Sequence, residues 1–227
     1  MTPLLAVAHR AGNTLLDLQA ALAAGVDLVE ADVHLYRGAL EVRHRKALGP
    51  HLYWERWAQL HRRRNLIVPD LREVLATAAG DPRLMLDLKG PSLDVAAEVA
   101  EALRLYAPGV PVAVCTKQWA MLDAFAGQSH VRRILSASDP LQLARLRARL
   151  RRGRVDGVSI RLRLLSEAVV EELHRATDTV LAWPVDSPAA LARARSIGVT
   201  GVISKNLPML AGLATEPVAR AGVELAA

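Results

Sequence analysis

The stretch DLVEADVHLYRGALEVRH, residues 27–44, decides the fold of this chain. Glu30 and Asp32 stand two apart within an apolar run, and in a β-strand that spacing places both carboxylates on one face. Neighbouring carboxylates repel each other, and an unpaired buried charge is costly. The pair therefore needs a cation between its members or must give up a charge, and a bound metal is the simplest source of that cation.

The second half of the same stretch predicts a β-hairpin. Residues 36–39 read as a short turn, and the run LEVRH that follows alternates again like a strand. A parallel crossover needs a dozen or more residues, so this run must fold back as an antiparallel arm. A turn centred on Arg37 and Gly38 returns His44 to the level of residues 30 and 31. The pattern leaves open which face His44 takes, because that depends on the register.

Apolar strands and helical segments alternate along the rest of the chain. Besides the carboxylate strand, strands are expected at 4–8, 83–88, 111–115, 131–135, 155–160, 179–183 and 200–203. Helices are expected at 14–24, 69–79, 92–106, 118–126, 139–150, 166–176 and 187–197. Residues 46–68 have no repeating pattern, so they are expected to form a loop with room for one short helix. Trp54 and Trp57 in that loop could line a lipid or head-group site, or cap the barrel.

This alternation predicts an α/β fold, a closed (β/α)8 TIM barrel with the hairpin as an extension after the second strand. Residues 1–227 are expected to form a single domain. A doubly wound open sheet would need a glycine-rich loop after the first strand, and AHRAGNT at 8–14 has one glycine. In a barrel the C-terminal strand ends share one mouth, where the chemistry gathers. The polar residues at such ends are His9, Glu30, Asp32, Asp87, Lys89 and Trp183.

Composition and charge exclude several classes of protein. Only four of the 29 basic residues are lysine, and the densest basic clusters lack interleaved aromatic residues, so the net charge of +6 does not predict nucleic-acid binding. No apolar run reaches the roughly 18 residues of a membrane span. The start, MTPLLAVAHR, has no signal-peptide pattern, which favours a cytoplasmic location. The charge remains compatible with anionic substrates or acidic lipid surfaces, and no oligomeric state is predicted.

The residues at the mouth suit phosphate chemistry. Glu30, Asp32 and Asp87 supply hard oxygen ligands, which favour Mg²⁺ or Ca²⁺. With the ion and with Arg10 and Lys89, the pocket becomes net positive and suits a phosphate. Two histidines, His9 and His44, can take a proton from an attacking hydroxyl and donate one to the leaving oxygen. The pattern predicts metal-assisted cleavage of a small-molecule phosphodiester.

Six segments together resemble the glycerophosphodiester phosphodiesterase family, whose members share a phospholipase-C-like barrel. They are AHR at 8–10 with Asn13-Thr14 after it, GVDLVEADVHL at 25–35, LEVRH at 40–44, LDLK at 86–89, LAWPVD at 181–186 and GVTGVISKNLP at 198–208. The resemblance implies hydrolysis of a glycerophosphodiester to glycerol 3-phosphate and an alcohol. It also implies roles for individual residues. These are His9 and His44 as acid and base, Glu30, Asp32 and Asp87 as metal ligands, and Arg10 and Lys89 as phosphate contacts.

Some positions depart from the pattern of that family. Asp87 as third ligand, Trp183 with Asp186, and Asn206 are similar to the related sphingomyelinase D branch, and Trp183, Asp186 and Asn206 are expected to contact substrate. This similarity implies a phospholipase D-type enzyme on lysophospholipids as the first alternative. Changes at Gly12, Arg45 and Lys205 motivate a second alternative, a non-catalytic phosphate- or phospholipid-binding barrel. The chain keeps both histidines and all three carboxylates, which favours the enzyme.

Overall fold

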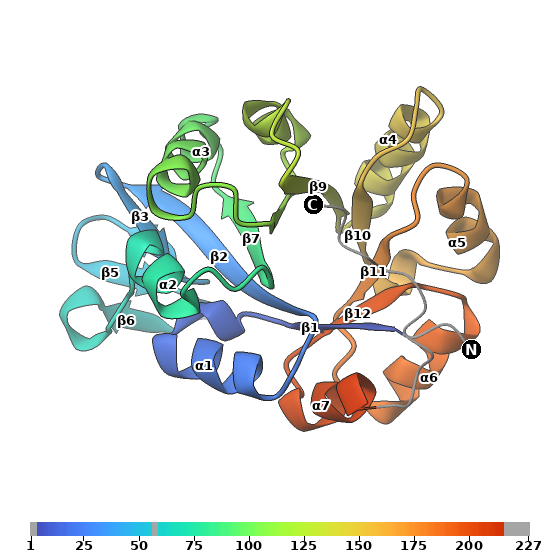
Figure 1. The fold of residues 1–227 in the computed structure, drawn as a ribbon, viewed down its shortest axis with the longest axis horizontal. Helices are drawn as coiled ribbons and strands as arrows, with labels where there is room; N and C mark the ends of the chain where they lie inside the picture. Colours follow the sequence, from blue (N-terminus) through green and yellow to red (C-terminus); the bar gives the residue numbers. More distant parts are fainter. Residues whose placement is uncertain (1–3, 56–58, 216–227) are drawn as a thin grey trace.

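Eight parallel strands close into a barrel in the computed structural model, which describes residues 4–55 and 59–215 (Figure 1). The strands follow one another as β1-β12-β11-β10-β9-β8-β7-β2, and β1 pairs with β2 to close the ring. They are β1 (Leu5–Ala8), β2 (Leu28–Tyr36), β7 (Leu84–Lys89), β8 (Val112–Thr116), β9 (Val131–Ala137), β10 (Gly157–Arg161), β11 (Val180–Trp183) and β12 (Gly201–Ser204). The predicted (β/α)8 barrel is confirmed.

Helices lie around the outside of the strands (Figure 1). They are α1 (Leu15–Ala23), α2 (Leu71–Ala78), α3 (Asp94–Tyr106), α4 (Pro140–Leu150), α5 (Glu167–His174), α6 (Pro188–Ser196) and α7 (Leu207–Thr215). Several begin at a capping side chain. Before α2, for example, the Asp70 carboxylate accepts from the Glu73 N–H, while the Glu73 carboxylate accepts from the Asp70 N–H. Among the residues that the structure describes, no helix is long and apolar enough to cross a bilayer.

Among the described residues, one predicted α-helix is absent and one α-helix was not expected. Residues 118–126 were predicted as an α-helix, but Trp119–Phe125 form a 3-10 helix, η3. Met121, Leu122 and Phe125 are buried there, and spacings of three and four residues do not distinguish the two helix types over so short a segment. The second difference is α7, which follows the last barrel strand and was not predicted.

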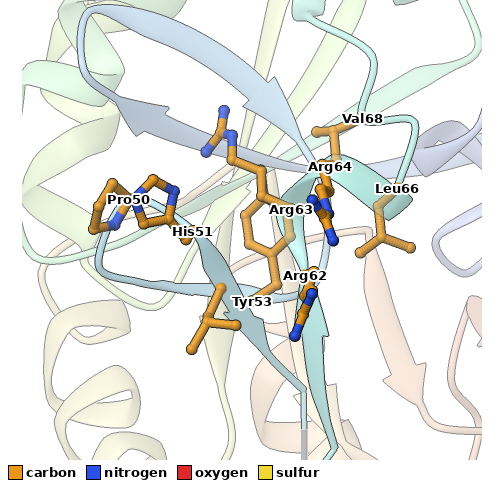
Figure 2. A pocket seen from close by; sticks show the side chains of 9 residues that line it. Pro50, His51, Tyr53, Arg62, Arg63, Arg64, Leu66 and Val68 are labelled. Carbon is orange, nitrogen blue, oxygen red and sulfur yellow. The ribbon is translucent and has the colours of Figure 1, made fainter.

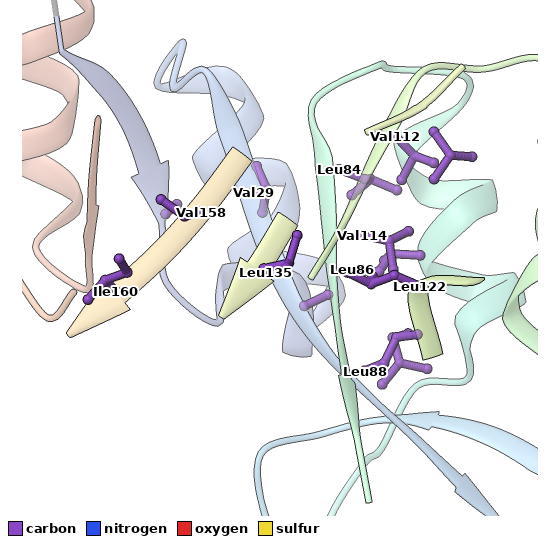
Figure 3. Close-up of a cluster of buried hydrophobic side chains, with 14 of the residues drawn as sticks. Val29, Leu84, Leu86, Leu88, Val112, Val114, Leu122, Leu135, Val158 and Ile160 are labelled. Atoms are coloured by element: carbon purple, nitrogen blue, oxygen red, sulfur yellow. The ribbon is translucent and has the colours of Figure 1, made fainter. Parts of the chain in front are cut away.

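Side-chain alternation divides each barrel strand between two apolar layers. One set, which includes Val29, Leu86 and Val114, packs outward under the helices (Figure 3). The other set packs inside the barrel and includes Val7, Met85, Ala113, Ile134, Leu181 and Ile203. Asp87 follows Met85 by two residues, and Glu30 follows the inward Leu28 by two, so these carboxylates continue the inward set toward the C-terminal mouth.

The hairpin forms as the sequence predicts. β3 (Ala39–Val42) pairs antiparallel with the end of β2, with Tyr36 opposite Ala39 and Val33 opposite Val42. Arg37 and Gly38, the two turn residues, have φ angles of 52° and 80°, the conformation of the tight turns that match strand twist. The Arg43 N–H still donates to the Asp32 carbonyl oxygen at 2.8 Å. The arm therefore delivers residue 44 to the barrel mouth.

Residues 46–68 correct the expectation of a loop. They contain a three-stranded antiparallel sheet made of β4 (Lys46–Leu48), β5 (Leu52–Trp54) and β6 (Leu60–Arg62), followed by a short 3-10 helix, η2 (Arg63–Asn65). Strands of three residues are too short to show alternation in a sequence. The sheet is held instead by contacts of Tyr53, which is fully buried. Trp57 lies outside the described residues.

A buried ionic cluster fastens this small sheet to the hairpin. The Glu41 carboxylate on β3 accepts hydrogen bonds from Arg43 Nε at 2.7 Å, from the Tyr53 hydroxyl at 3.2 Å and from Arg63 Nη2. Both arginines also lie against the Tyr53 ring, Arg43 at 4.9 Å and Arg63 at 5.2 Å from its centroid. The cluster therefore joins β3, β5 and η2, and removing one member would leave a buried charge unpaired.

Gly12 occupies a place in the fold where a side chain does not fit. A Cβ atom at this position would lie 2.6 Å from the Ala31 Cβ and 3.2 Å from the Glu30 carbonyl oxygen. We expect Gly12→Ala to lower the free energy of unfolding by about 1–3 kcal/mol, because strand β2 cannot move without displacing the carboxylates. Urea unfolding at neutral pH measures the change.

Gly212 in α7 supplies a matched control, since no atom lies within 4 Å of a Cβ built there. Gly212→Ala should leave stability unchanged or raise it by up to about 1 kcal/mol, because alanine is the better helix former. Equal stabilities of the two variants would show that Gly12 is not closely packed.

Candidate active site

Three carboxylates meet at the mouth of the barrel. Glu30 and Asp32 project from β2 and Asp87 from β7, and Asp32 and Asp87 are direct neighbours in the strand register. One oxygen from each of the three lies within 4.8 Å of the others. Glu30 and Asp32 are buried, at 3% and 1% exposure. The structure thus brings together the trio that the sequence predicts.

Each carboxylate is held by polar partners from neighbouring segments. Glu30 accepts the backbone N–H of Arg10 at 2.6 Å, and Arg10 has a left-handed backbone with φ 63°. Asp32 accepts from Asn13 Nδ2 at 2.8 Å, and Lys89 Nζ lies 2.7 Å from its Oδ1. Lys89 also contacts Asp87. The Arg10 guanidinium is 3.7 Å from Asp32. Both predicted phosphate contacts, Arg10 and Lys89, therefore border the carboxylates.

The electrostatics of the trio suit a divalent cation. Burial, and then the Asp32 charge, raise the pKa of Glu30 well above its ordinary value, and burial also raises the pKa of Asp87. Burial opposes ionisation of Asp32 too, but Lys89, His44 and Asn13 outweigh it and hold the pKa of Asp32 low. A bound cation would therefore stabilise the ionised forms of Glu30 and Asp87. All the ligand atoms that the trio offers are oxygens. The donor set fits Mg²⁺ or Ca²⁺.

His9 lies at the end of β1 and is suited to accept a proton. Its N–H donates to the Ser204 carbonyl oxygen at 2.7 Å, which fixes the start of the turn, and its Nδ1 is buried without a hydrogen-bond partner. Burial, and then the Arg10 charge, lower the pKa of His9 to about 4. Its imidazole is therefore neutral at pH 7 and available as a base.

His44 lies in a bend directly after β3, where the strand alternation has ended. Its Nδ1 is 3.3 Å from Asp32 Oδ2, and 35% of its side chain is exposed. The carboxylate favours the tautomer with hydrogen on Nδ1, which leaves Nε2 as the other reactive nitrogen. The structure resolves the question of the face that the hairpin pattern left open, since His44 turns toward the carboxylates.

The lowered pKa of His9 predicts a pH dependence of stability. The unfolded chain takes up a proton on this histidine near pH 6.5, whereas the folded protein resists it until about pH 4. Stability present above pH 6.5 is therefore lost as the pH falls through this window. His9→Gln should flatten the decline in the free energy of unfolding, measured in urea at several pH values between 7 and 4. The same substitution at His130, a half-buried histidine directly before β9 and outside the carboxylate site, is the control, and equal slopes for His9→Gln and wild type would refute the assignment.

The remaining predicted site residues lie at the far side of the mouth. Trp183 ends β11, and Lys117 Nζ lies 5.2 Å from the centroid of its ring. Asp186 Oδ1 accepts from the Ser204 hydroxyl at 3.1 Å and from the Lys205 N–H at 2.8 Å. Asn206 Oδ1 accepts the Met209 N–H at 3.1 Å in the first turn of α7. Asp186 and Asn206 thus brace the loop after β12, and their contact with substrate stays a prediction.

Sequence reasoning assigned no role to three residues of the mouth. Lys117 follows Ala113 and Cys115 in the inward alternation of β8, a signal that the pattern contains. His34 continues the Glu30–Asp32 alternation, its Nε2 is buried without a partner, and burial, then Arg43, lower its pKa to about 3. Asn13 exchanges two hydrogen bonds of 2.8 Å with Asp32. Nothing in the sequence except the Asn13-Thr14 motif indicates that Asn13 pairs with Asp32.

Comparisons with known proteins identify the fold. No protein-family model matches the chain, and no curated protein matches it. The glycerophosphodiester phosphodiesterase of Thermotoga maritima superposes with a TM-score of 0.74 at 18% identity, over 94% of this chain and 99% of that one. An Oleispira antarctica phosphodiesterase, solved in complex with the product sn-glycerol-3-phosphate, gives a TM-score of 0.70 at 21% identity, over 91% and 95%. A glycerophosphodiester phosphodiesterase from Parabacteroides distasonis gives 0.68 at 17% identity, over 94% and 96%. At these identities the likeness establishes that the chain has the barrel fold of these enzymes.

Proposed function

We propose that this protein is a divalent-metal-dependent phosphodiesterase that hydrolyses glycerophosphodiesters to glycerol 3-phosphate and an alcohol. The observation that carries the proposal is the convergence of Glu30, Asp32 and Asp87 with two histidines at one barrel mouth. The fold supports it, since the solved structures reported above that superpose on this chain are phosphodiesterases, one of them in complex with sn-glycerol-3-phosphate.

The proposed chemistry divides proton transfer between the two histidines. Neutral His9 accepts the proton of the attacking hydroxyl, which can be the free glycerol hydroxyl of the substrate, as a new P–O bond forms. His44, oriented by Asp32, donates a proton to the leaving alcohol oxygen as its P–O bond breaks. Water then opens the cyclic phosphate, with the two histidines in exchanged roles.

Cationic side chains and the carboxylates supply the rest of the site. Arg10 and Lys89 border the trio and would attract the phosphate oxygens. Glu30, Asp32 and Asp87 would hold the Mg²⁺ or Ca²⁺ ion, which stabilises negative charge on the phosphate when bound. Asn13 and Lys89 keep Asp32 in place for this role.

One observation weighs against each of the two alternative functions, the lysophospholipid-cleaving enzyme and the non-catalytic binding protein. Lys117 lies against the Trp183 ring, and its positive charge would repel a choline group on that face, which weighs against a choline lysophospholipid as substrate. A binding protein would have no use for two proton-transfer groups.

An enzyme-coupled assay of glycerol 3-phosphate tests the proposal. Purified protein is incubated with glycerophosphoglycerol, glycerophosphoethanolamine, glycerophosphocholine and lysophosphatidylcholine, with Mg²⁺, with Ca²⁺ and with chelator. Metal-dependent release from at least one glycerophosphodiester is expected. Cleavage of lysophosphatidylcholine alone, measured as released choline because the other product keeps its acyl chain and is not glycerol 3-phosphate, would favour the lipid alternative. No turnover of any diester by folded, metal-loaded protein would favour the binding alternative.

A further inference from the structure

The small sheet β4-β5-β6 presents an apolar face that the barrel does not cover. The register places Lys46, Trp54 and Leu60 in one row across the sheet and Leu48, Leu52 and Arg62 in another. Both rows share one face because they lie two residues apart on each strand. Leu48, Trp54 and Leu60 are 55%, 41% and 53% exposed. We call these six residues the outer face.

The opposite side of the sheet carries its attachment to the rest of the molecule. Ala47, Tyr53 and His61 alternate with the outer face, and Tyr53 is completely buried against Arg43 and Arg63. The contacts of Tyr53 that attach the sheet therefore lie on the side opposite the outer face. Exposed leucines and a tryptophan in one patch are uncommon on the surface of a monomer and mark a site of interaction.

A basic pocket adjoins the outer face at the Arg62 end (Figure 2). Its volume is about 660 Å³, and its lining contains Arg62, Arg63, Arg64 and His51 and no acidic residue. Among the residues that the structure describes, no carboxylate forms an ion pair with Arg62 or Arg64. Arg63 donates to Glu41 through Nη2, whereas its Nη1 is buried without a partner. The pocket thus offers several guanidinium donors to an anion.

Charge and apolar character together indicate what covers the outer face. Its only charged members are cations, with Lys46 Nζ 5.7 Å from the Trp54 ring centroid. Two copies of the face would bring like charges together, which disfavours a symmetric dimer. Leucine and tryptophan side chains next to lysine and arginine are typical of proteins that lie on a bilayer surface with acidic lipids.

We propose that the outer face docks this protein onto anionic phospholipid surfaces. Leu48, Trp54 and Leu60 would enter the head-group boundary, and the basic pocket beside Arg62 would bind a lipid phosphate. β4 begins two residues after His44, so the docked sheet is joined directly to the segment that carries this histidine. The inference is independent of the proposed hydrolysis, because binding to vesicles is measured without turnover.

Flotation of full-length protein with vesicles tests the inference. Vesicles of phosphatidylcholine alone are compared with vesicles of equal parts phosphatidylcholine and phosphatidylglycerol, at low and high salt. We expect at least about tenfold stronger binding to the anionic vesicles, weakened by salt. Arg62→Gln should weaken binding about fivefold, since one basic residue near such a surface contributes about that factor. Leu60→Ser should weaken it by a similar factor at both salt concentrations.

Matched variants elsewhere on the surface serve as controls. Leu105 on α3 is 52% exposed, so Leu105→Ser repeats the chemistry of Leu60→Ser away from the outer face. Arg152→Gln repeats the loss of charge at an exposed turn after α4. Equal binding to neutral and anionic vesicles, no binding to either, or equal effects of controls and test variants would overturn the proposal. If the protein does not bind vesicles but forms a dimer in light scattering, and Leu60→Ser abolishes that dimer, the outer face would be assigned to contact with a second copy instead.

Discussion

Alanine at His9 or at His44 is expected to lower kcat/KM for a glycerophosphodiester by about 10²- to 10⁴-fold, the range typical of a lost general acid or base. The two histidines come from opposite approaches to the mouth, His9 from the end of β1 and His44 from the hairpin arm. His9 is neutral because burial and Arg10 lower its pKa to about 4, and His44 is turned toward Asp32 at 3.3 Å. Neither ring fills the apolar core, so both variants should fold.

Controls for this prediction separate chemistry from general damage. His130→Ala removes a half-buried histidine that lies before β9, outside the candidate active site, and should leave kcat/KM unchanged. The double variant His9→Ala/His44→Ala should lose less activity than the product of the two single effects, because groups that act in one step are not additive. Full activity of either single variant, in protein shown to be folded by circular dichroism, would refute the role of that histidine.

Loss of the metal site is expected to reduce the rate by more than about 10³-fold, since charge stabilisation by such an ion is worth several kcal/mol. Chelator should do this in the wild type, and Asp87→Asn should do it in the presence of Mg²⁺ or Ca²⁺. Asp87 contributes an oxygen to the trio, and the amide of asparagine keeps the shape while removing the charge. Glu101→Gln is a control, because it makes the same carboxylate-to-amide change at an exposed residue on α3 paired with Arg104.

Thermal unfolding supplies a readout of the same site that does not depend on activity. At a metal concentration 100 times the Kd, binding should stabilise the wild type by about 2.7 kcal/mol. Asp87→Asn should show a much smaller response to the metal. Glu30→Gln should unfold at a higher temperature than the wild type in chelator, because burial and Asp32 raise the pKa of Glu30 and disfavour its charge. A metal response that survives in both variants would place the ion elsewhere.

Much of the barrel and the carboxylate site follows from one regularity of the sequence. In every barrel strand, inward and outward residues alternate, so Glu30, Asp32 and Asp87 could be placed at the mouth by counting along β2 and β7. The hairpin could also be predicted from the sequence, because the short turn at Arg37 and Gly38 is too short for a crossover between parallel strands. The same counting along β8 leads to Lys117, which was overlooked.

Other features depend on packing that a single sequence does not display. The strands β4, β5 and β6 have three residues each, and their sheet is held by the contacts of Glu41 with Tyr53 and Arg63 across 12 and 22 residues of chain. The direction of His44 depends on a bend after β3. Asp186 and Asn206 were predicted from family resemblance to contact substrate, and their hydrogen bonds within the β12–α7 loop became visible only in the folded chain.

Phosphorus NMR of one reaction tests the central claim most directly. Wild-type protein with Mg²⁺ or Ca²⁺ should convert the diester signal of glycerophosphoglycerol to the monoester signal of glycerol 3-phosphate, and chelator should stop the conversion. His9→Ala should leave the diester signal unchanged over the same time. Persistence of the diester with folded, metal-loaded wild type, or conversion at the same rate in chelator, would contradict a metal-dependent two-histidine phosphodiesterase.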